Sequence, residues 1–529
     1  CFFGDGASNT GNFHESLNLA SAWDLPVVYV VENNLYGMSV PFVKISARPD
    51  IADRVAAYDI PGVSIDGMDP IVVYEAVSTA LERARQGAGP TLIECKTYRW
   101  YGHSRSDPRK YRTKEEERSW HKRDPLTTFP KQLIEAGIVT QEEIDAIDAL
   151  AEKKVEAATE FALESPMPDP AQVEQDVYVL KPPRADEIEA ERRLRERVRS
   201  DPDMRVQTYG EALCDAMREE LLRDPRVFIM GEDVGLYGGA YGATRGLYAE
   251  FGGERVIDTP ISEAIIGGAA VGAAMTGLRP VAEIMYVDFT PLAMDQIANQ
   301  GAKNRYMFGG KTTVPMVIRT EGGAGRSIAA HHSQSLEALW DHFPGIYLIM
   351  PATPYDAKGL LKAAIRDDNP IMFIEHKMLY KTEGPVPEEE YLIPLGVADI
   401  KRKGTDVSII TYSRMVLRAL EAAEKLVEEG ISAEVLDLRS LKPLDMETVV
   451  QSVRKTGRVV GVTEAYKTGS FISELFTLIN ESAFDWLDAP MVRVAAADVP
   501  VPMSESLEDA AIPNVDAIIQ GVHKVLRYA

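Results

Sequence analysis

The chain has 529 residues, 45% of them hydrophobic and 26% charged, which is the composition of a globular protein with about three or four domains. Its formal net charge of −24 opposes the approach of a nucleic acid or an anionic membrane surface and argues against both as main partners. The three cysteines, Cys1, Cys95 and Cys214, form no ligand cluster and are too few for a disulfide framework. We therefore expect a reducing compartment, the cytoplasm or a mitochondrial matrix, and take the cytoplasm as the location; no apolar run is long enough to span a membrane.

The first part of the chain is predicted to alternate strands and helices. Residues 1–3 read as the end of a buried strand, 27–31 as a second strand and 91–95 as a third, and a helix is expected to begin near Asn12. A doubly wound sheet needs further strands beneath the first one. We therefore expect this segment to be the latter part of a domain.

The most informative pattern is the turn Gly4-Asp5-Gly6 after the first strand, followed by Asn33-Asn34 at the end of the second strand. Either motif alone is usually a surface turn or a loop. Together, at the carboxyl ends of two parallel strands, an aspartate and an asparagine can direct two oxygens to one hard cation. The glycines let the backbone turn sharply and approach a ligand, and the amino end of the following helix favours a diphosphate.

A polar loop at 98–112 follows the third strand and contains His103. A lone histidine is more often structural than catalytic, but loops after strands are where sites are built. Residues 126–163 have helical spacing, and prolines then interrupt the pattern between 166 and 183. We expect the charged stretch 185–200 to be a solvated helix without a binding role.

A second α/β unit begins near Val206, with a predicted helix at 210–223 and a strand at 227–230. The helix expected at 263–276 is rich in Gly and Ala, which predicts close packing against another backbone at a domain or subunit contact. Glu263 begins this helix. Taken alone, an acidic residue there usually only compensates the helix dipole.

The second unit also carries the adjacent pair His331-His332 on a polar loop. In an extended chain successive side chains alternate, so the two rings cannot point the same way. A third unit is predicted from a strand at 407–412, a helix at 416–429 and a strand at 433–438. It has no catalytic pattern, and we expect it to serve oligomerisation or an interface.

The segment from Gly4 to Asn34 resembles the cofactor motif of thiamine diphosphate enzymes. The run from Gly277 to Phe289, which follows Glu263, resembles the matching stretch in the decarboxylating component of 2-oxo acid dehydrogenase complexes. By this resemblance, residues 1–165 look like the latter half of the alpha subunit of that family. Residues 206–529 look like a complete beta subunit, joined to the first part in one polypeptide.

The resemblance implies an α/β fold of thiamine diphosphate-binding doubly wound parallel sheets with a C-terminal transketolase-like α/β domain. The expected domains are a partial pyrophosphate-binding domain at 1–165, a linker at 166–205, a pyrimidine-binding domain at 206–390 and the C-terminal domain at 391–529. In this family the cofactor lies across the alpha and beta folds.

The resemblance also implies which residues hold the cofactors, thiamine diphosphate and magnesium. Gly4, Asp5 and Gly6 would form the turn at the diphosphate. Asp5, Asn34 and the carbonyl of Tyr36 would bind magnesium.

Four further residues receive roles by the same resemblance. Glu263 would donate a proton to the aminopyrimidine ring of the cofactor. The exocyclic amine of that ring then becomes basic enough to deprotonate the thiazolium carbon. Phe289 matches a ring near the pyrimidine, although core packing explains a buried aromatic there equally well. His332, through the family's His-Ser-Gln segment, and His103 would serve acyl transfer, in which an imidazole protonates a sulfur of the opening lipoyl ring.

The implied activity is oxidative decarboxylation of a 2-oxo acid, or cleavage of acetoin, with acyl transfer to the lipoyl-lysine of an acyltransferase component. Pyruvate, branched-chain 2-oxo acids and acetoin stay open as substrates, with the Gly-Asp-Gly turn and residues 351–380 closer to pyruvate dehydrogenase or acetoin dehydrogenase. A homodimer is expected. Two alternatives are a transketolase-like transfer of two-carbon units, for which the basic groups that bind a sugar phosphate are not found, and a truncated, non-catalytic assembly subunit.

Overall fold

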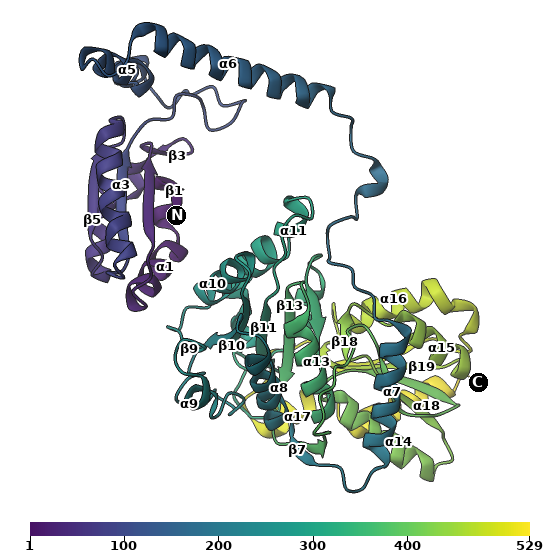
Figure 1. Ribbon diagram of the computed structural model, residues 1–529. Coiled ribbons are helices and arrows are strands. Elements are labelled where there is room, and N and C mark those ends of the chain that lie inside the picture. The colour runs from purple at the N-terminus through teal and green to yellow at the C-terminus, as the bar shows by residue number, and fades with distance from the viewer. Residues whose placement is uncertain (529) are drawn as a thin grey trace. The chain divides into compact units, whose positions relative to one another are not determined.

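The computed structural model describes residues 1–528, which form two compact units, one from Cys1 to Val173 and one from Glu174 onward (Figure 1). Each unit has its own sheets and its own hydrophobic core. We call them unit 1 and unit 2, and each is described by itself.

Unit 1 is built around a parallel sheet with strand order β1-β2-β6-β5. Its main elements are β1 (Phe2–Gly4), α1 (Gly11–Ala22), β2 (Val28–Asn33), β5 (Gly62–Asp66), α3 (Pro70–Arg85) and β6 (Thr91–Lys96). Side chains of β2 alternate between the two faces, since Val31 packs with Phe13 of α1 whereas Val30 packs with Ala80 of α3. Helices therefore cover both faces, as the sequence predicts.

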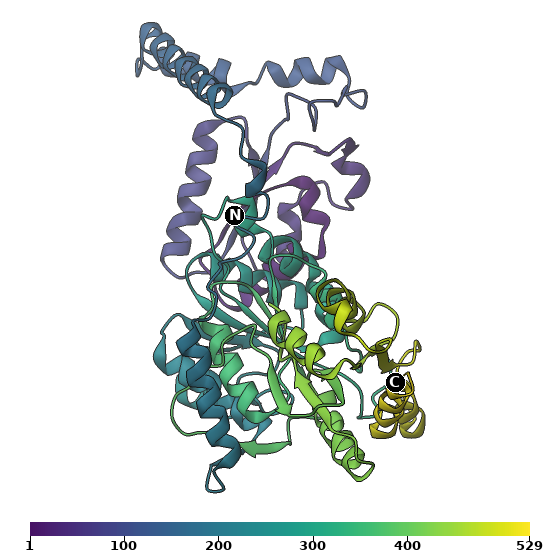
Figure 2. The same ribbon diagram turned by 90° about the vertical axis from the view of Figure 1, so that its right-hand side faces the viewer.

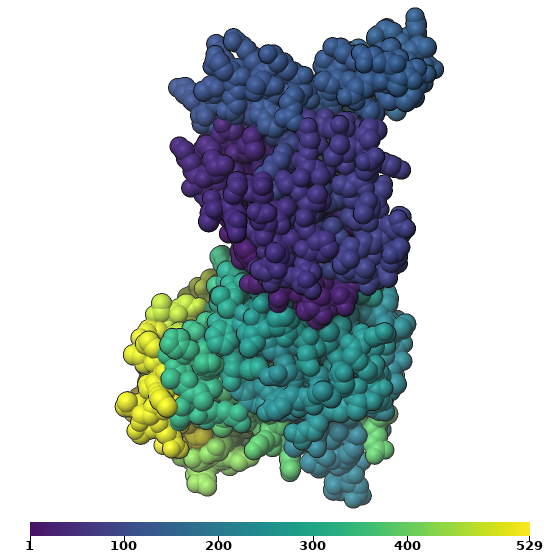
Figure 3. Space-filling model, turned by 90° about the vertical axis from the view of Figure 1, so that its left-hand side faces the viewer, coloured from purple at the N-terminus to yellow at the C-terminus, as the bar shows by residue number. Residues whose placement is uncertain are grey.

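The remainder of unit 1 consists of short elements and three later helices. They are η1 (Asp5–Asn9), β3 (Tyr36–Gly37), β4 (Val40–Pro41), α2 (Phe42–Ile45), η2 (Ala52–Tyr58), α4 (Lys114–His121), α5 (Pro125–Glu135), α6 (Gln141–Glu164) and η3 (Pro170–Gln172). A capping box between Thr140 and Glu143 begins α6, and no residue of this helix is buried. By contrast, Figure 3 shows the first hundred residues (purple) closely packed on the face in view.

The first sheet of unit 2 has strand order β18-β12-β13-β11-β10-β8-β9, and all its pairs are parallel except β12 with β18. The strands are β8 (Val227–Gly231), β9 (Val256–Asp258), β10 (Arg279–Tyr286), β11 (Val317–Gly322), β12 (Tyr347–Ile349), β13 (Ile371–His376) and β18 (Ser440–Lys442). The accompanying helices are α8 (Tyr209–Arg223), α9 (Leu247–Phe251), α10 (Glu263–Met275), η4 (Val287–Ala293), η5 (Asp295–Gly301), α11 (Asn304–Met307), α12 (Glu337–Asp341) and α13 (Pro354–Arg366). The predicted strand at 227–230 and helix at 263–276 are both present.

The second sheet of unit 2 has strand order β15-β17-β16-β19-β20. Its elements are β15 (Asp399–Arg402), β16 (Val407–Thr411), α14 (Met415–Glu428), β17 (Ala433–Asp437), α15 (Met446–Thr456), β19 (Val459–Tyr466), α16 (Phe471–Ala483), β20 (Val492–Ala496), α17 (Glu505–Ala511) and α18 (Val515–Leu526). Figure 2 shows the C-terminal helices (yellow) at the surface of this unit. The antiparallel pair β7 (Val206–Thr208) and β14 (Glu383–Pro385) completes the unit. The α/β fold class is confirmed.

The charged stretch 185–200 forms a helix, α7 (Ala185–Ser200), which is exposed over most of its length as expected, but Glu191 and Val198 are buried. Glu191 is only 3% exposed and pairs with Arg439 at 3.2 Å. Arg195 pairs with Asp399 at 2.8 Å. These ion pairs dock the helix on unit 2, because its charged side chains contact residues of opposite charge that are distant in the sequence.

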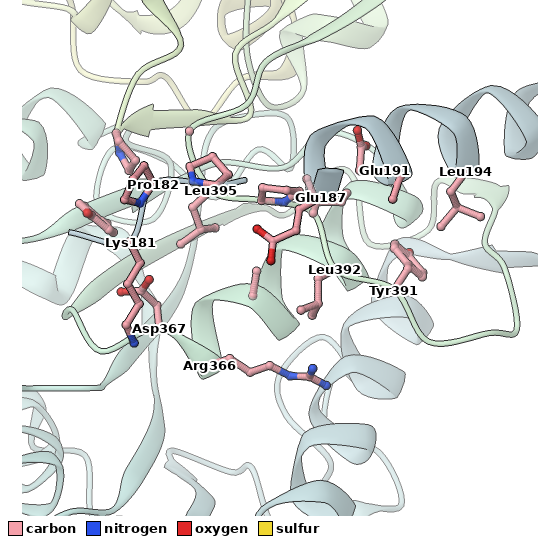
Figure 4. A pocket seen from close by; sticks show the side chains of 18 of the residues that line it. Lys181, Pro182, Glu187, Glu191, Leu194, Arg366, Asp367, Tyr391, Leu392 and Leu395 are labelled. Carbon is pink, nitrogen blue, oxygen red and sulfur yellow. The ribbon is translucent and has the colours of Figure 1, made fainter. Parts of the chain in front are cut away.

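The segment before α7 is also attached to unit 2. The backbone N–H of Val179 donates to the side-chain oxygen of Asn369 at 2.7 Å, and the Asn369 amide donates back to the Val179 carbonyl at 3.0 Å. A cavity of about 1010 Å³ lies along this segment and α7. The side chains of Glu187, Glu191 and Leu194 on the helix line this cavity (Figure 4). Part of the predicted linker 166–205 is therefore held against unit 2.

None of the helices formed by residues 1–528 combines the length and the apolar character that a bilayer span needs.

Candidate active site

Asp5 and Asn34 lie together at the carboxyl edge of the unit 1 sheet. β1 and β2 are parallel neighbours, so both strands end at the same edge. Asp5 is 1% exposed, and its carboxylate accepts the backbone N–H of Asn34. The Oδ2 atom of Asp5 and the Oδ1 atom of Asn34 are both buried without a hydrogen-bond partner. Two orphaned oxygens at one place are the donor set that a hard cation binds.

The neighbouring asparagine has a different task. Asn33 donates to Glu94 at 2.6 Å, and its own oxygen accepts the backbone N–H of Leu35 at 3.0 Å. Leu35 has a positive φ of 72°, which redirects the chain after β2. Asn33 thus fixes the edge of the sheet and leaves the Asn34 oxygen free.

The surroundings of Asp5 raise the pKa of its carboxyl group. Burial raises the pKa of Asp5, while the hydrogen bonds that it accepts and the guanidinium of Arg99 act in the opposite direction. A divalent cation would stabilise the ionised form. Among residues 1–528, no group of three or more His, Cys, Asp or Glu side chains is arranged to hold a metal ion, so the remaining ligands of a cation at Asp5 would be carbonyl, phosphate or water oxygens.

The glycines of the turn act through space rather than through backbone strain. Gly4 has an ordinary extended conformation, with φ of −86°, and neither Gly4 nor Gly6 has a positive φ. The turn expected at these glycines therefore uses no left-handed backbone conformation. What the absent side chains supply is open room: a Cβ on Gly4 or on Gly6 would meet no atom closer than 3.6 Å, which leaves the backbone accessible.

Helix α1 begins at Gly11, close to the predicted start, and its N-cap residue Thr10 makes no side-chain capping bond. Its first backbone N–H groups are therefore available to an anion such as a diphosphate.

Tyr36 lies two residues beyond Asn34, in β3, and is buried. Its hydroxyl donates to Glu116 at 2.9 Å, and the guanidinium of Arg112 lies 4.8 Å from the ring centroid. These contacts hold the residue in place. That its carbonyl binds magnesium stays a prediction.

His103 lies on the polar loop after β6 and is exposed. Its backbone N–H donates to Asp107 at 2.8 Å, and Asp107 also accepts the hydroxyl of Tyr111 at 2.6 Å. The Tyr111 bond, together with the loop N–H donors, lowers the pKa of Asp107 to about 2, so this carboxylate is ionised over the physiological range. The loop is thus ordered around Asp107, and the imidazole of His103 is presented to solvent.

In unit 2, Glu263 occupies the first turn of α10 and is half-buried. The helix packs closely on η4, since a Cβ on Gly267 would lie only 3.2 Å from the Cβ of Ala293. The small residues therefore bring the backbone of α10 against the turn that carries Phe289.

Glu232 is a site residue that the sequence did not assign. It follows β8 directly, is 7% exposed and has a buried Oε1 atom without a partner. Burial, together with the nearby charges of Glu263, Asp233 and Glu283, raises the pKa of Glu232 to about 7. The Gly231-Glu232-Asp233 run at a strand end was a visible signal, but only the fold shows that Glu232 and Glu263 interact.

Phe289 and His332 come together with Tyr286 in a cluster of aromatic rings. The His332 ring centroid lies 4.8 Å from that of Tyr286 and 5.4 Å from that of Phe289, with the rings nearly perpendicular. His332 is half-buried, whereas His331 is exposed, so the two adjacent rings differ as expected. The Gln334 backbone N–H donates to Asp288 at 3.2 Å and ties this loop to η4.

The predicted residues thus fall into two sets. Gly4, Asp5, Gly6, Asn34, Tyr36 and His103 belong to unit 1, and Glu263, Phe289 and His332 belong to unit 2.

Three family models match the chain. They are "Dehydrogenase E1 component" over residues 1–171, "Transketolase, pyrimidine binding domain" over 205–383 and "Transketolase, C-terminal domain" over 396–518.

Several relatives match the second part of the chain over nearly their full length. The beta subunit of 2-oxoisovalerate dehydrogenase of Bacillus subtilis is 46% identical over 61% of this chain and 100% of its own length. The beta subunit of the acetoin:2,6-dichlorophenolindophenol oxidoreductase of Cupriavidus necator and the pyruvate dehydrogenase E1 beta subunit of Porphyra purpurea are each 48% identical, over 60% of this chain and 96% of their own length.

Among solved structures, a chain described as a split gene transketolase, inactive beta4 tetramer, covers 60% of this chain and 98% of its own length with a TM-score of 0.50 and 25% identity. The family models, the relatives and this fold agree. The chain belongs to the thiamine diphosphate-dependent 2-oxo acid dehydrogenase (E1) family and joins an E1 dehydrogenase segment to a beta-subunit-like segment in one polypeptide.

Proposed function

We propose that this protein decarboxylates pyruvate, or cleaves acetoin, and passes the acyl group to the lipoyl-lysine of an acyltransferase component. The observation that carries the proposal is the pair of buried, unpartnered oxygens of Asp5 and Asn34 at the edge of the unit 1 sheet. Such a pair is costly without a ligand, and magnesium with a diphosphate would satisfy it.

In unit 1, Asp5, Asn34 and the Tyr36 carbonyl would hold magnesium, and the open backbone at Gly4 and Gly6 would receive the diphosphate. When bound, thiamine diphosphate supplies a carbanion-stabilising thiazolium ring. The amino end of α1 would add backbone N–H donors to the phosphate oxygens.

In unit 2, the carboxyl of Glu263 would hold a proton against a ring nitrogen of the cofactor. Glu232 supports this role, because a carboxyl with a pKa of about 7 exchanges its proton near neutrality and interacts with Glu263. The aromatic cluster of Phe289, Tyr286 and His332 would exclude water from the same region.

His332 would deliver a proton to the sulfur that is released when the lipoyl ring opens. An imidazole suits this transfer because its ordinary pKa lies near neutral pH. His103, exposed on the loop ordered by Asp107, would assist from unit 1.

The relatives indicate the class of substrate but not the individual compound. Relatives at similar identity are named for 2-oxoisovalerate, acetoin and pyruvate, so the comparison supports a short 2-oxo acid or acetoin in general. We propose pyruvate or acetoin on the basis of the Gly-Asp-Gly turn and residues 351–380. We further propose a homodimer that works with a lipoyl-bearing acyltransferase.

The test is an assay of the full-length gene product with magnesium and thiamine diphosphate. Pyruvate, acetoin, branched-chain 2-oxo acids and a sugar phosphate are supplied in turn, with either an artificial electron acceptor or an isolated lipoyl domain. We expect turnover of pyruvate or acetoin with both acceptors. Turnover of the sugar phosphate alone would establish a transketolase-like enzyme instead, and no turnover with any substrate would support a non-catalytic assembly subunit.

A further inference from the structure

Lys377 is a buried lysine directly after β13, close to the loop that carries His332. Its side chain is enclosed and the residue is 2% exposed. The ammonium donates a hydrogen bond to the backbone carbonyl of His332 and lies 5.1 Å from the ring centroid of Tyr286. Tyr286 is itself the ring against which the His332 imidazole packs, at 4.8 Å. Lys377 therefore contacts both the backbone of His332 and the ring that orients its side chain.

The surroundings of Lys377 make an ammonium costly. Burial lowers the pKa of Lys377, and burial likewise raises the pKa of its neighbour Glu321, 4.0 Å away, to about 8. Apolar residues of similar length in place of both Lys377 and Glu321 would avoid this cost. A lysine here thus needs a reason other than stability.

The two ends of the loop are held by other contacts. Glu508 accepts the backbone N–H groups of Gly325 at 2.7 Å and Ser327 at 2.9 Å, which fixes the beginning of the loop. Gln334 is paired with Gly323 through its carbonyl at 2.9 Å, which fixes the end. In the part of the chain that the structure describes, Lys377 is the side chain that anchors the carbonyl of His332 between these two ends.

We propose that Lys377 is a positioning residue that holds the His332 loop, and through Tyr286 the His332 ring, in the geometry needed for acyl transfer. The inference rests on the proposed role of His332. Lys377 does not itself exchange a proton with the substrate; it acts through the backbone and the ring of its neighbour. Loss of the anchor should therefore affect transfer to a lipoyl group more than decarboxylation, since a small displacement of a catalytic group lowers its rate steeply.

The test compares Lys377→Met in the full-length protein with Lys377→Arg, which keeps a donor, and with Lys381→Met, which removes an exposed lysine four positions further on. Each variant is assayed with an artificial acceptor and, separately, for reductive acylation of an isolated lipoyl domain. We expect Lys377→Met to lose about tenfold or more in acylation and less than about twofold with the artificial acceptor. Lys377→Arg should recover part of the loss, and Lys381→Met should match the wild type.

Equal losses in both assays, or no loss, would overturn the inference. Because Lys377→Met leaves Glu321 buried without its partner, the double variant Lys377→Met/Glu321→Gln is measured as well. If the anchor matters, the double variant regains thermal stability but not acylation. If acylation returns together with stability, the role of Lys377 is structural and the inference is wrong.

A second readout does not need the cofactor. Carbethoxylation of His332, followed by peptide mass spectrometry on the protein alone, reports how firmly the ring is held, with exposed His331 as the internal reference. We expect His332 in Lys377→Met to react about fivefold faster or more, because the loop opens locally. An unchanged rate contradicts the anchor. A wild type that shows this protection but never acylates a lipoyl domain would refute the proposed function and leave the anchor standing.

Discussion

At the level of single residues, the proposed chemistry depends on side chains whose charge or hydrogen bonding the protein leaves incomplete. Asp5 and Asn34 each bury an oxygen without a partner, and Glu232 does the same in unit 2. Native proteins rarely leave such atoms unpaired, and the position of these three at strand ends supports the proposed ligand site.

The first prediction concerns Glu263. Glu263→Gln keeps the shape of the side chain but cannot exchange a proton in the same way, so turnover with the artificial acceptor should fall about a hundredfold or more. Affinity for thiamine diphosphate, measured by fluorescence titration, should change by less than about tenfold, because the residues proposed to bind the diphosphate belong to unit 1. Full activity in this variant would remove Glu263 from the mechanism. Glu254→Gln, at an exposed position, is the matched control.

The second prediction follows from the raised pKa of Glu232. Its pKa is about 7 when folded and 4.5 ordinarily, so between these values the folded state binds more protons than the unfolded state. Its contribution to the free energy of unfolding is therefore present at low pH and is lost as the pH rises through this window. In Glu232→Gln this position does not titrate, so the variant does not lose that part of the free energy of unfolding as the pH rises.

We expect the stability of Glu232→Gln relative to wild type to increase by about 2 kcal/mol between pH 4.5 and pH 8. Urea unfolding of both proteins at the two pH values measures this difference. A constant difference would show that the pKa of Glu232 is the same in the folded and unfolded states, and therefore not raised by folding.

The sequence allowed some of these residues to be predicted and not others. Asp5 and Asn34 could be identified because strand ends and turn residues are local features, and the structure brings them together. Glu232 and Lys377 could not be given roles, because their partners Glu263 and His332 come from other strands and loops. The glycines predict a sharp turn at residues 4–6, yet Gly4 is extended.

At the level of helices and strands, helix α7 shows that a charge pattern in the sequence does not predict which charged side chains are buried. A stretch this rich in Arg and Glu reads as solvated, and several of its pairs, such as Glu189 with Arg192, do lie at the surface. Glu191, however, faces inward to Arg439, which is 248 residues away in the chain. Only the tertiary structure distinguishes the two glutamates.

This contrast gives a third prediction. Glu191→Gln leaves the guanidinium of Arg439 with one buried partner fewer and should lower the free energy of unfolding by about 3 kcal/mol. Glu189→Gln removes a surface pair and should cost less than about 1 kcal/mol. Chemical denaturation followed by circular dichroism measures both. Equal effects of the two substitutions would mean that α7 is not docked.

Taken as a whole, the chain consists of two units with a proline-rich segment between them. Residues 161–174 are exposed, whereas the residues from Tyr178 onward are attached to unit 2 through Asn369 and Tyr347. The domain boundaries at 165, 205 and 390 are retained as a proposal. The alternation of strands and helices in each unit could be predicted from sequence, but the attachment of the linker could not, since it depends on distant partners.

A fourth prediction tests this organisation. A glutamate-specific protease should cut first at Glu164 or Glu174, since both are exposed. The product that begins after either site should persist as a folded fragment containing both sheets of unit 2. Mass spectrometry over a digestion time course identifies the fragments. Early cleavage at the buried Glu191 would contradict the docked position of α7.

The proposed function requires above all that unit 1 binds magnesium and thiamine diphosphate through Asp5. Calorimetric titration of the full-length protein with thiamine diphosphate, in the presence and absence of magnesium, decides whether it does. We expect saturable, magnesium-dependent binding that Asp5→Asn weakens about a hundredfold, while the exposed control Asp59→Asn leaves it unchanged. Absence of binding to the wild type, or equal affinity in Asp5→Asn, would refute this role of Asp5.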